Sequence, residues 1–293
     1  MKKILVLLLT LAFVSACGPK ELEADEPFVC DNCEDWNQPQ APFRIYGDTW
    51  YVGTSGLSSI LVETSDGLVL FDGALPQSVH LIAENIRSLG FDPLEIAAIF
   101  VSHAHYDHVG GVAALQHYTG AAVYTSSEGS KALLAGELQP DDPQYSPDEQ
   151  SGFPAVANVI AVLDDDEVEI GDLRVRAIYT PGHTPGGTSW TWESCALGTC
   201  NQVVYADSLT AVSAQGYRFS AGPAANQLIA SADRISLLDC DILLSPHPFF
   251  FGMKDKLERR GDGNPFVNNV ACAIYAETVL DWLEQRLRAE GYR

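Results

Sequence analysis

The segment His103-Ala-His105-Tyr-Asp107-His108 constrains this chain more than any other feature. It gathers three imidazoles and one carboxylate within six residues. It follows the run 96–101, whose short, uncharged and β-branched sequence predicts a buried strand. Side chains on a loop that leaves a strand are free to converge on one point. Histidines beside a carboxylate suit zinc or iron, so the segment predicts a metal centre at the end of a strand.

Two further histidines stand in similar positions. His183 lies in a Pro/Gly-rich turn after an expected strand at 173–179, and His247 follows an expected strand at 241–245. Either histidine alone would be an ordinary loop residue, but the repeated pattern favours a ligand role for both. His80 and His117 lie in expected helices, and we interpret them as surface residues.

Taken together, these ligand residues resemble those of the metallo-β-lactamase superfamily, and the resemblance covers nearly all of the mature chain. The segments around His183, around Ser208 and Thr210 (Tyr-Ala-Asp-Ser-Leu-Thr) and around His247 (Ser-Pro-His-Pro) are similar to subclass B3. Other subclasses place a cysteine in the second metal site, where this chain has Ser208. The resemblance implies two zinc ions per chain, one held by His103, His105 and His183, and the other by Asp107, His108 and His247.

The same resemblance implies zinc-dependent hydrolysis of β-lactam antibiotics (penicillins, cephalosporins and carbapenems) by a metal-bound hydroxide, which confers resistance. Asp107 would also orient this nucleophile. Ser208 and Thr210 would bind the substrate carboxylate, with threonine in place of the family's usual serine. Asp72, after an expected strand at 68–71, resembles the aspartate that fixes a ligand histidine from behind.

Other hydrolases of the superfamily, acting on lactones, thioesters or phosphodiesters, share this ligand set. Most of them use an aspartate that bridges both metals near position 207–208, so Asp207 separates the hypotheses. In the B3-like interpretation Asp207 faces away from the metals and supports its loop. A non-catalytic periplasmic zinc-binding lipoprotein is the remaining alternative. The net charge of −22 argues against nucleic acid as a partner.

The pattern of elements predicts an α/β fold in a single domain. Of the 293 residues, 46% are hydrophobic, which is enough for a full core, and no internal linker interrupts them. Two series of strands, each followed by helices, predict an αββα sandwich of two mixed β-sheets. Strands are expected at 43–52, 59–63, 68–71, 96–101, 159–163, 168–170, 173–179, 188–193, 203–206 and 241–245, and helices at 77–89, 112–118, 224–238 and 264–290. Residues 140–154 are expected to form a loop over the site, and Trp36 and Phe153 to pack near it.

The N-terminus predicts export. Lys2 and Lys3 precede the apolar stretch 4–14, and Val14-Ser15-Ala16-Cys17 is typical of a bacterial lipoprotein. We therefore expect a signal peptide at 1–16, a lipid-modified Cys17, a flexible tether at 17–40 and the single domain at 41–293. The mature protein is expected in the periplasm as a monomer, touching a membrane only through the lipid on Cys17.

Six further cysteines suit an oxidising compartment. Cys195 and Cys200 bracket an expected hairpin turn, where a local bridge forms easily. The resemblance to subclass B3 implies a bridge between Cys240 and Cys272. Cys30 and Cys33 remain open between a short-range bridge and a pair of free thiols.

Overall fold

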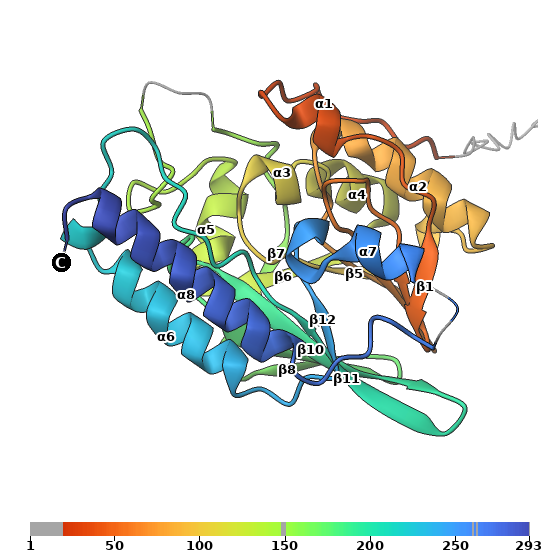
Figure 1. The fold of residues 1–293 in the computed structure, drawn as a ribbon. Helices are drawn as coiled ribbons and strands as arrows, with labels where there is room; N and C mark the ends of the chain where they lie inside the picture. Colours follow the sequence, from red (N-terminus) through yellow and green to blue (C-terminus); the bar gives the residue numbers. More distant parts are fainter. Residues whose placement is uncertain (1–19, 148–150, 260, 262, 293) are drawn as a thin grey trace, which may run out of the picture.

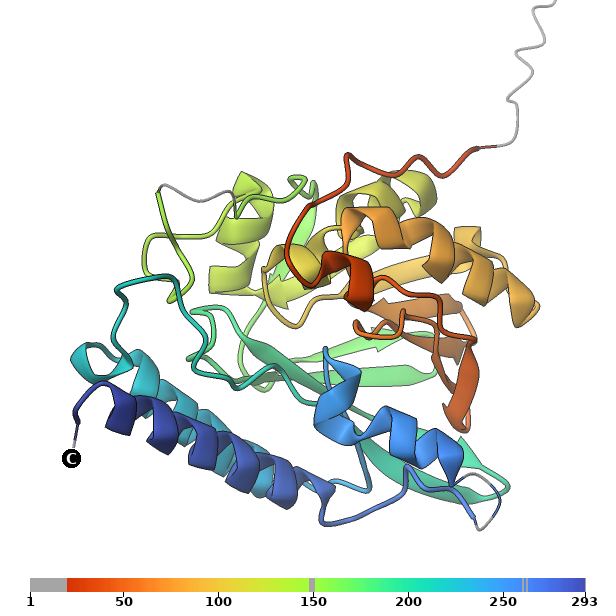
Figure 2. The same cartoon turned by 45° about the horizontal axis from the view of Figure 1, so that its top comes forward.

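The computed structural model describes residues 20–147, 151–259, 261 and 263–292. Two β-sheets stack face to face between outer layers of helices (Figures 1 and 2). The first sheet has the strand order β1-β2-β3-β4-β5-β6-β7, and the second β12-β11-β10-β9-β8. The first is antiparallel through β4 and parallel from β4 to β7; in the second, only the pair β11–β12 is parallel. The predicted sandwich of two mixed sheets is confirmed.

The strands are β1 Phe43–Tyr46, β2 Thr49–Tyr51, β3 Ile60–Thr64, β4 Gly67–Phe71, β5 Ile96–Phe100, β6 Ala122–Ser126, β7 Val159–Val162, β8 Glu167–Ile170, β9 Leu173–Tyr179, β10 Thr188–Ala196, β11 Thr199–Tyr205 and β12 Ile242–Leu244. The α-helices are α1 Cys33–Trp36, α2 Val79–Ser88, α3 Tyr106–Val109, α4 Val112–Thr119, α5 Ser127–Ala135, α6 Ala224–Ser236, α7 Met253–Glu258 and α8 Ala271–Ala289. Short 3-10 helices are η1 Pro76–Ser78, η2 Pro93–Glu95, η3 Phe219–Ala221 and η4 Pro248–Phe251.

Strand β4 shows why the central strands are apolar throughout. Successive side chains of a strand point to opposite faces of the sheet. Val69 and Phe71 therefore enter the core between the two sheets, where Phe71 stacks on Trp192 at 4.4 Å between ring centroids. Leu68 and Leu70 enter the second core, under α2, α4 and α5. Both faces of the sheet are buried, so no polar alternation is needed.

The boundaries of two predicted elements are wrong. The expected strand 43–52 is two strands, because Gly47 turns the chain with a φ of +48° between β1 and β2. A Cβ at Gly47 would lie 2.5 Å from the Cys195 carbonyl oxygen. The expected helix 264–290 begins only at Ala271. The Asn264 and Asn268 side chains accept backbone hydrogen bonds from Phe266 and Val270, which holds this segment in turns.

Several residues of the expected flexible tether at 17–40 pack against the domain. Phe28 stacks on Tyr106 at 3.8 Å and exchanges two hydrogen bonds with the Gln77 amide through its backbone N–H and C=O. Leu22 and Trp36 pack against the core under α2 and α4, and Cys33 is buried in it. The red segment in Figure 2 follows this path. Composition favoured a tether because the few apolar side chains are widely spaced among acidic ones. The signal peptide and Cys17 lie outside the described residues.

Three cysteine pairs lie at disulfide distance: Cys30 and Cys33, Cys195 and Cys200, and Cys240 and Cys272. Cys195 and Cys200 are directly paired residues of the β10–β11 hairpin, and Cys240 lies just before β12 and opposite the first turn of α8. Among the described residues, no helix is both long and apolar enough to span a membrane.

The end of α8 holds the loop that follows β11. Helices α6 and α8 lie side by side on the outer face of the second sheet (Figures 1 and 2). Glu290 accepts hydrogen bonds from the backbone N–H groups of Phe219 and Ser220 and from Arg286. Burial alone would raise the pKa of Glu290, but these donors lower it to about 2.

Replacing Glu290→Gln should therefore destabilise the fold at neutral pH, by about 1–3 kcal/mol for the loss of hydrogen bonds to a charged group. The folded-state pKa lies below the ordinary 4.5, so this stability is present above pH 4.5 and is lost as the pH falls towards about 2. Urea unfolding at several pH values measures the difference. Glu284→Gln, which breaks an exposed pair with Arg288, is the control and should cost less than about 1 kcal/mol. Equal effects of the two variants at pH 7 would contradict this account.

Candidate metal centre

Three strand ends bring the six predicted ligands together. His103 and His105 lie between β5 and α3, and Asp107 and His108 lie within the single turn of α3. His183 follows β9, and His247 follows β12. The six side chains form two groups of three.

The first group is His103, His105 and His183. Their candidate ligand atoms lie within 4.8 Å of one another, and all three residues are buried. The ring centroids are 4.8 Å (His103–His105), 4.8 Å (His103–His183) and 4.9 Å (His105–His183) apart. Three rings at the corners of one triangle are the arrangement expected of a metal site with three protein ligands.

The second group is Asp107, His108 and His247. The Asp107 Oδ2 atom lies 3.3 Å from His108 Nε2 and 3.5 Å from His247 Nε2. The rings of His103 and His108 are 4.3 Å apart, so the two groups are neighbours. The division into two groups is the one that the resemblance implied.

Oxygen partners fix the orientation of the histidine rings. His103 Nδ1 lies 2.7 Å from Asp207 Oδ1, His183 Nδ1 lies 2.9 Å from the Thr210 carbonyl oxygen, and His247 Nδ1 lies 3.1 Å from that of Gly56. A neutral imidazole that donates from one nitrogen keeps a lone pair on the other for a metal. His103 Nε2 is buried and has no hydrogen-bond partner within the described part of the chain, which fits a metal ligand.

The local electrostatics of His103, His183 and Asp107 favour the forms that bind metal, whereas Asp142 raises the pKa of His105 against the effect of burial. Burial, together with the neighbouring histidines, holds the pKa of His103 well below its usual range and lowers that of His183 to about 3. Burial alone would raise the pKa of Asp107, but His108 and His247 outweigh it and hold that pKa well below 3.8. Neutral imidazoles and an ionised carboxylate are the states required for binding a divalent cation.

Among the described residues Asp72 forms no hydrogen bond to a ligand histidine, in contrast to its predicted role, although His108 acts on its pKa electrostatically. Its carboxylate accepts hydrogen bonds from the Ser102 N–H at 2.8 Å, from the Ser102 hydroxyl at 2.7 Å and from the Tyr205 hydroxyl at 2.7 Å. It therefore supports the backbone just before the metal segment. Asp207 is the carboxylate that fixes His103. Asp207 lies outside both metal groups. The sequence predicts only a loop-supporting role for it, and its contact with His103 adds a second role.

The predicted substrate-binding residues lie beside the first group. Ser208 is buried, and its hydroxyl has no hydrogen-bond partner among the described residues. Thr210 is partly exposed, and its hydroxyl lies 3.1 Å from His183 Nδ1.

Trp36 lies over His247, with ring centroids 5.2 Å apart, whereas Phe153 is buried in the core under α2 and α4. His80 and His117 belong to neither metal group.

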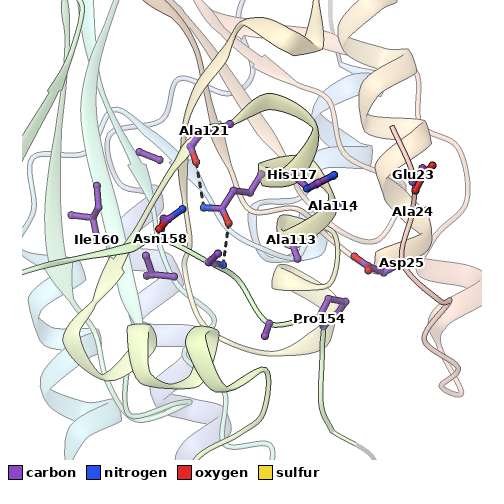
Figure 3. Close-up of a pocket in the computed structure, with 16 residues that line it drawn as sticks. Glu23, Ala24, Asp25, Ala113, Ala114, His117, Ala121, Pro154, Asn158 and Ile160 are labelled. Carbon is purple, nitrogen blue, oxygen red and sulfur yellow. Dashed lines mark hydrogen bonds between the residues drawn. The ribbon is translucent and has the colours of Figure 1, made fainter. Parts of the chain in front are cut away.

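A hollow of about 1020 Å³ lies away from this centre, between residues 23–25, helix α4 and the segment 154–160 (Figure 3). Alanines form much of its wall, and its polar lining residues are Glu23, Asp25, Gln116, His117 and Asn158. None of the candidate metal groups found in the described residues lies there. Size alone therefore does not mark the functional site of this chain.

Comparison with known proteins identifies the family. The family model described as "Metallo-beta-lactamase superfamily" matches residues 52–247, and the chain belongs to this superfamily. Within it, the chain is similar to subclass B3 enzymes. It is 41% identical to the structure titled "Rm3 metallo-beta-lactamase", with a TM-score of 0.87, over 90% of this chain and 99% of that chain. It is also 41% identical to MEM-A1, a subclass B3 metallo-beta-lactamase from a soil metagenome library, with a TM-score of 0.85, over 88% of this chain and 99% of that chain.

Curated relatives match over shorter stretches. A hydroxyacylglutathione hydrolase of Gloeobacter violaceus is 29% identical over 132 residues, which make up 45% of this chain and 42% of that protein. The chain spans about half the length of the first three curated relatives, namely 59%, 42% and 49%. The family model and the B3 structures therefore show the family and the fold, and the histidine-rich ligand groups of this chain indicate a metal cofactor.

The Asp207–His103 contact predicts different outcomes for two substitutions. Asp207→Asn keeps an oxygen that can accept from His103 Nδ1, so metal content should stay unchanged. Asp207→Ala removes the acceptor and should weaken metal binding at the first group by about 10- to 100-fold. Titration of the metal-free protein with zinc against a chelating indicator measures both affinities. Loss of metal from Asp207→Asn to the same extent as from His103→Ala would instead make Asp207 a ligand.

Proposed function

We propose that this protein is a zinc-dependent β-lactamase that hydrolyses the amide bond of β-lactam antibiotics. The observation that carries the proposal is the pair of adjacent ligand groups, three histidines beside an Asp-His-His set. The similarity to subclass B3 structures along 99% of their length supports it.

Each group is proposed to hold one zinc ion, which gives two per chain. Three protein ligands leave a coordination position open for water or substrate, as catalytic zinc sites require. When bound, zinc supplies a coordinated water with a pKa near 7 and a Lewis acid for the substrate carbonyl.

The surrounding residues are proposed to position the substrate and the water. Asp107 is ionised at neutral pH and lies between His108 and His247, where it can accept a hydrogen bond from the attacking water. Ser208 and Thr210 are proposed to donate their hydroxyl protons to the substrate carboxylate. A hollow of about 480 Å³ beside His183, lined by Gly182, Thr184 and the loops around 141–143 and 216–224, has the size of a small-molecule pocket.

A thioester hydrolase is the other candidate, because a hydroxyacylglutathione hydrolase is among the relatives. A carboxylate bridging both metals would favour it. Asp207 is instead engaged by His103 at 2.7 Å, and position 208 carries a hydroxyl. These two features favour the β-lactamase.

We further propose that the chain is exported to the bacterial periplasm as a monomer, with Cys17 as a lipid anchor to the outer membrane. The motif at residues 14–17 supports the anchor. In that oxidising compartment the three close cysteine pairs would form disulfides.

Turnover and metal content test the proposal directly. The purified protein should hydrolyse nitrocefin and imipenem, lose activity with a chelator, regain it with zinc, and contain two zinc ions per chain by elemental analysis. Asp107→Asn should lower both the second zinc content and the turnover. Two bound zinc ions without hydrolysis of any β-lactam would refute the β-lactamase, and a zinc content near one would refute the dinuclear site.

Replacing both hydroxyls, in Ser208→Ala with Thr210→Val, should raise KM more than it lowers kcat, because the ligand groups remain while substrate positioning is lost. At roughly 1.5–3 kcal/mol per hydrogen bond to a charged group, kcat/KM should fall about 10²-fold or more. Steady-state kinetics and zinc content should be measured together. Thr278→Val, a hydroxyl on the exposed side of α8, is the control and should not change either value. Unchanged kcat/KM in the double variant would remove these residues from substrate binding.

A further inference from the structure

The third histidine of the first group also has a carboxylate behind it. His105 Nε2 lies 3.3 Å from Asp142 Oδ2 and 3.4 Å from Asp142 Oδ1. Both residues are buried, at 4% and 5% exposure, although 37 positions separate them in the chain. Asp142 belongs to the loop between α5 and β7, which contributes none of the six ligands.

We propose that Asp142 is a positioning residue that turns Nδ1 of His105 towards the metal and ties the 139–145 loop to the metal centre. This inference rests on the proposed metal binding by His105. A carboxylate that accepts from Nε2–H leaves the lone pair on Nδ1, so the ring can bind a metal only through that atom.

The backbone around Asp142 holds its carboxylate in place. The Gln144 N–H donates to Asp142 Oδ1 at 2.8 Å, the Tyr145 N–H donates to the Asp142 carbonyl at 2.9 Å, and the Asp142 N–H donates to the Gln139 carbonyl at 3.0 Å. These bonds form a compact turn. By leaving His105 the carboxylate would lose its hydrogen bond from the Gln144 N–H, so ring orientation and loop position are linked.

The same turn also reaches the inner side of the first group. Gln144 Nε2 lies 3.3 Å from His105 Nδ1 and 3.4 Å from His183 Nε2, the two atoms that would face a metal. The Pro143 carbonyl accepts a hydrogen bond from the Ala214 N–H, which joins this loop to the one after Thr210. Metal binding would displace the Gln144 amide from these nitrogens, while Asp142 keeps the loop attached through His105.

Asp142 also stabilises its own turn, so the test must separate this local role from the positioning of the His105 ring. Asp142→Asn separates the two roles. Asparagine caps such turns as well as aspartate does, so its oxygen can still accept from the Gln144 N–H. Its NH₂ group would then take the place of Oδ2, the oxygen nearer to the Nε2–H of His105, and two donors cannot form a hydrogen bond; the remaining oxygen is 3.4 Å away and already bonded to Gln144. Asp141→Asn is the matched control, since it makes the same change of charge at the adjacent, exposed residue.

Zinc titration of the metal-free variants against a chelating indicator measures the effect. We expect Asp142→Asn to weaken binding at the first group by about 10- to 100-fold. Its metal-free thermal unfolding should match that of the wild type, and Asp141→Asn should bind zinc normally. Wild-type zinc affinity in Asp142→Asn would overturn the proposal and leave Asp142 a turn residue only.

Hydrogen exchange of the segment 137–147 provides a second measurement that does not depend on activity. Zinc should slow exchange there in the wild type and in Asp141→Asn, and less so in Asp142→Asn at equal zinc occupancy. Equal protection in all three would contradict the link between loop and metal. Failure of the wild type to hydrolyse β-lactams would refute the proposed reaction but leave the zinc titration interpretable.

Discussion

A histidine that binds a metal usually donates a hydrogen bond from its other ring nitrogen, which fixes the orientation of the ring. The rest of this centre depends on the oxygens that accept these hydrogen bonds. The oxygens that hold the rings come from distant places: Asp207 after β11, the Gly56 carbonyl between β2 and β3, and Asp142 between α5 and β7. These segments belong to both sheets. The centre can therefore form only when the two sheets are stacked. The Trp190 indole of the second sheet donates to the Val101 carbonyl at 3.1 Å, which fixes this stacking at the end of the strand that carries the metal segment.

Buried carboxylates surround this centre. Asp72, Asp107, Asp142 and Asp207 are each no more than 7% exposed. Burying an anion is costly unless it is paired and hydrogen-bonded. Histidines contact three of the four, and Ser102 and Tyr205 bond the fourth. Burial raises the pKa of Asp72 and Asp207, whereas the neighbouring histidines lower those of Asp107 and Asp142, so a divalent cation would mainly offset the charge of the latter two.

The sequence predicted those parts of the centre that depend on neighbouring residues in the chain. The metal segment and the turns around His183 and His247 each follow an apolar strand, so their common edge was predictable. Strand β6 and helix α5 were missed because the Ser126 side chain caps α5 directly at the end of the strand, with no Gly or Pro between them. The roles of Asp142 and Asp207 were not predictable. Their partners lie 37 and 104 residues away, and neither aspartate stands in a pattern that distinguishes it from an ordinary loop residue.

The position of Asp207 also limits the chemistry of the centre. A Cβ added at Gly187 would lie 2.4 Å from Asp207 Oδ2 and 2.6 Å from the Thr180 carbonyl oxygen. The carboxylate is thus packed between the His103 ring and the backbone of residue 187. The next residue, Ser208, presents a buried hydroxyl in place of a further anion. Asp107 is then the single carboxylate among the six candidate ligands, so metals held there would be more strongly electron-withdrawing than metals that also shared a bridging carboxylate. That arrangement fits attack by water on the carbonyl of a cyclic amide whose adjacent carboxylate is bound by the Ser208 and Thr210 hydroxyls, as proposed above.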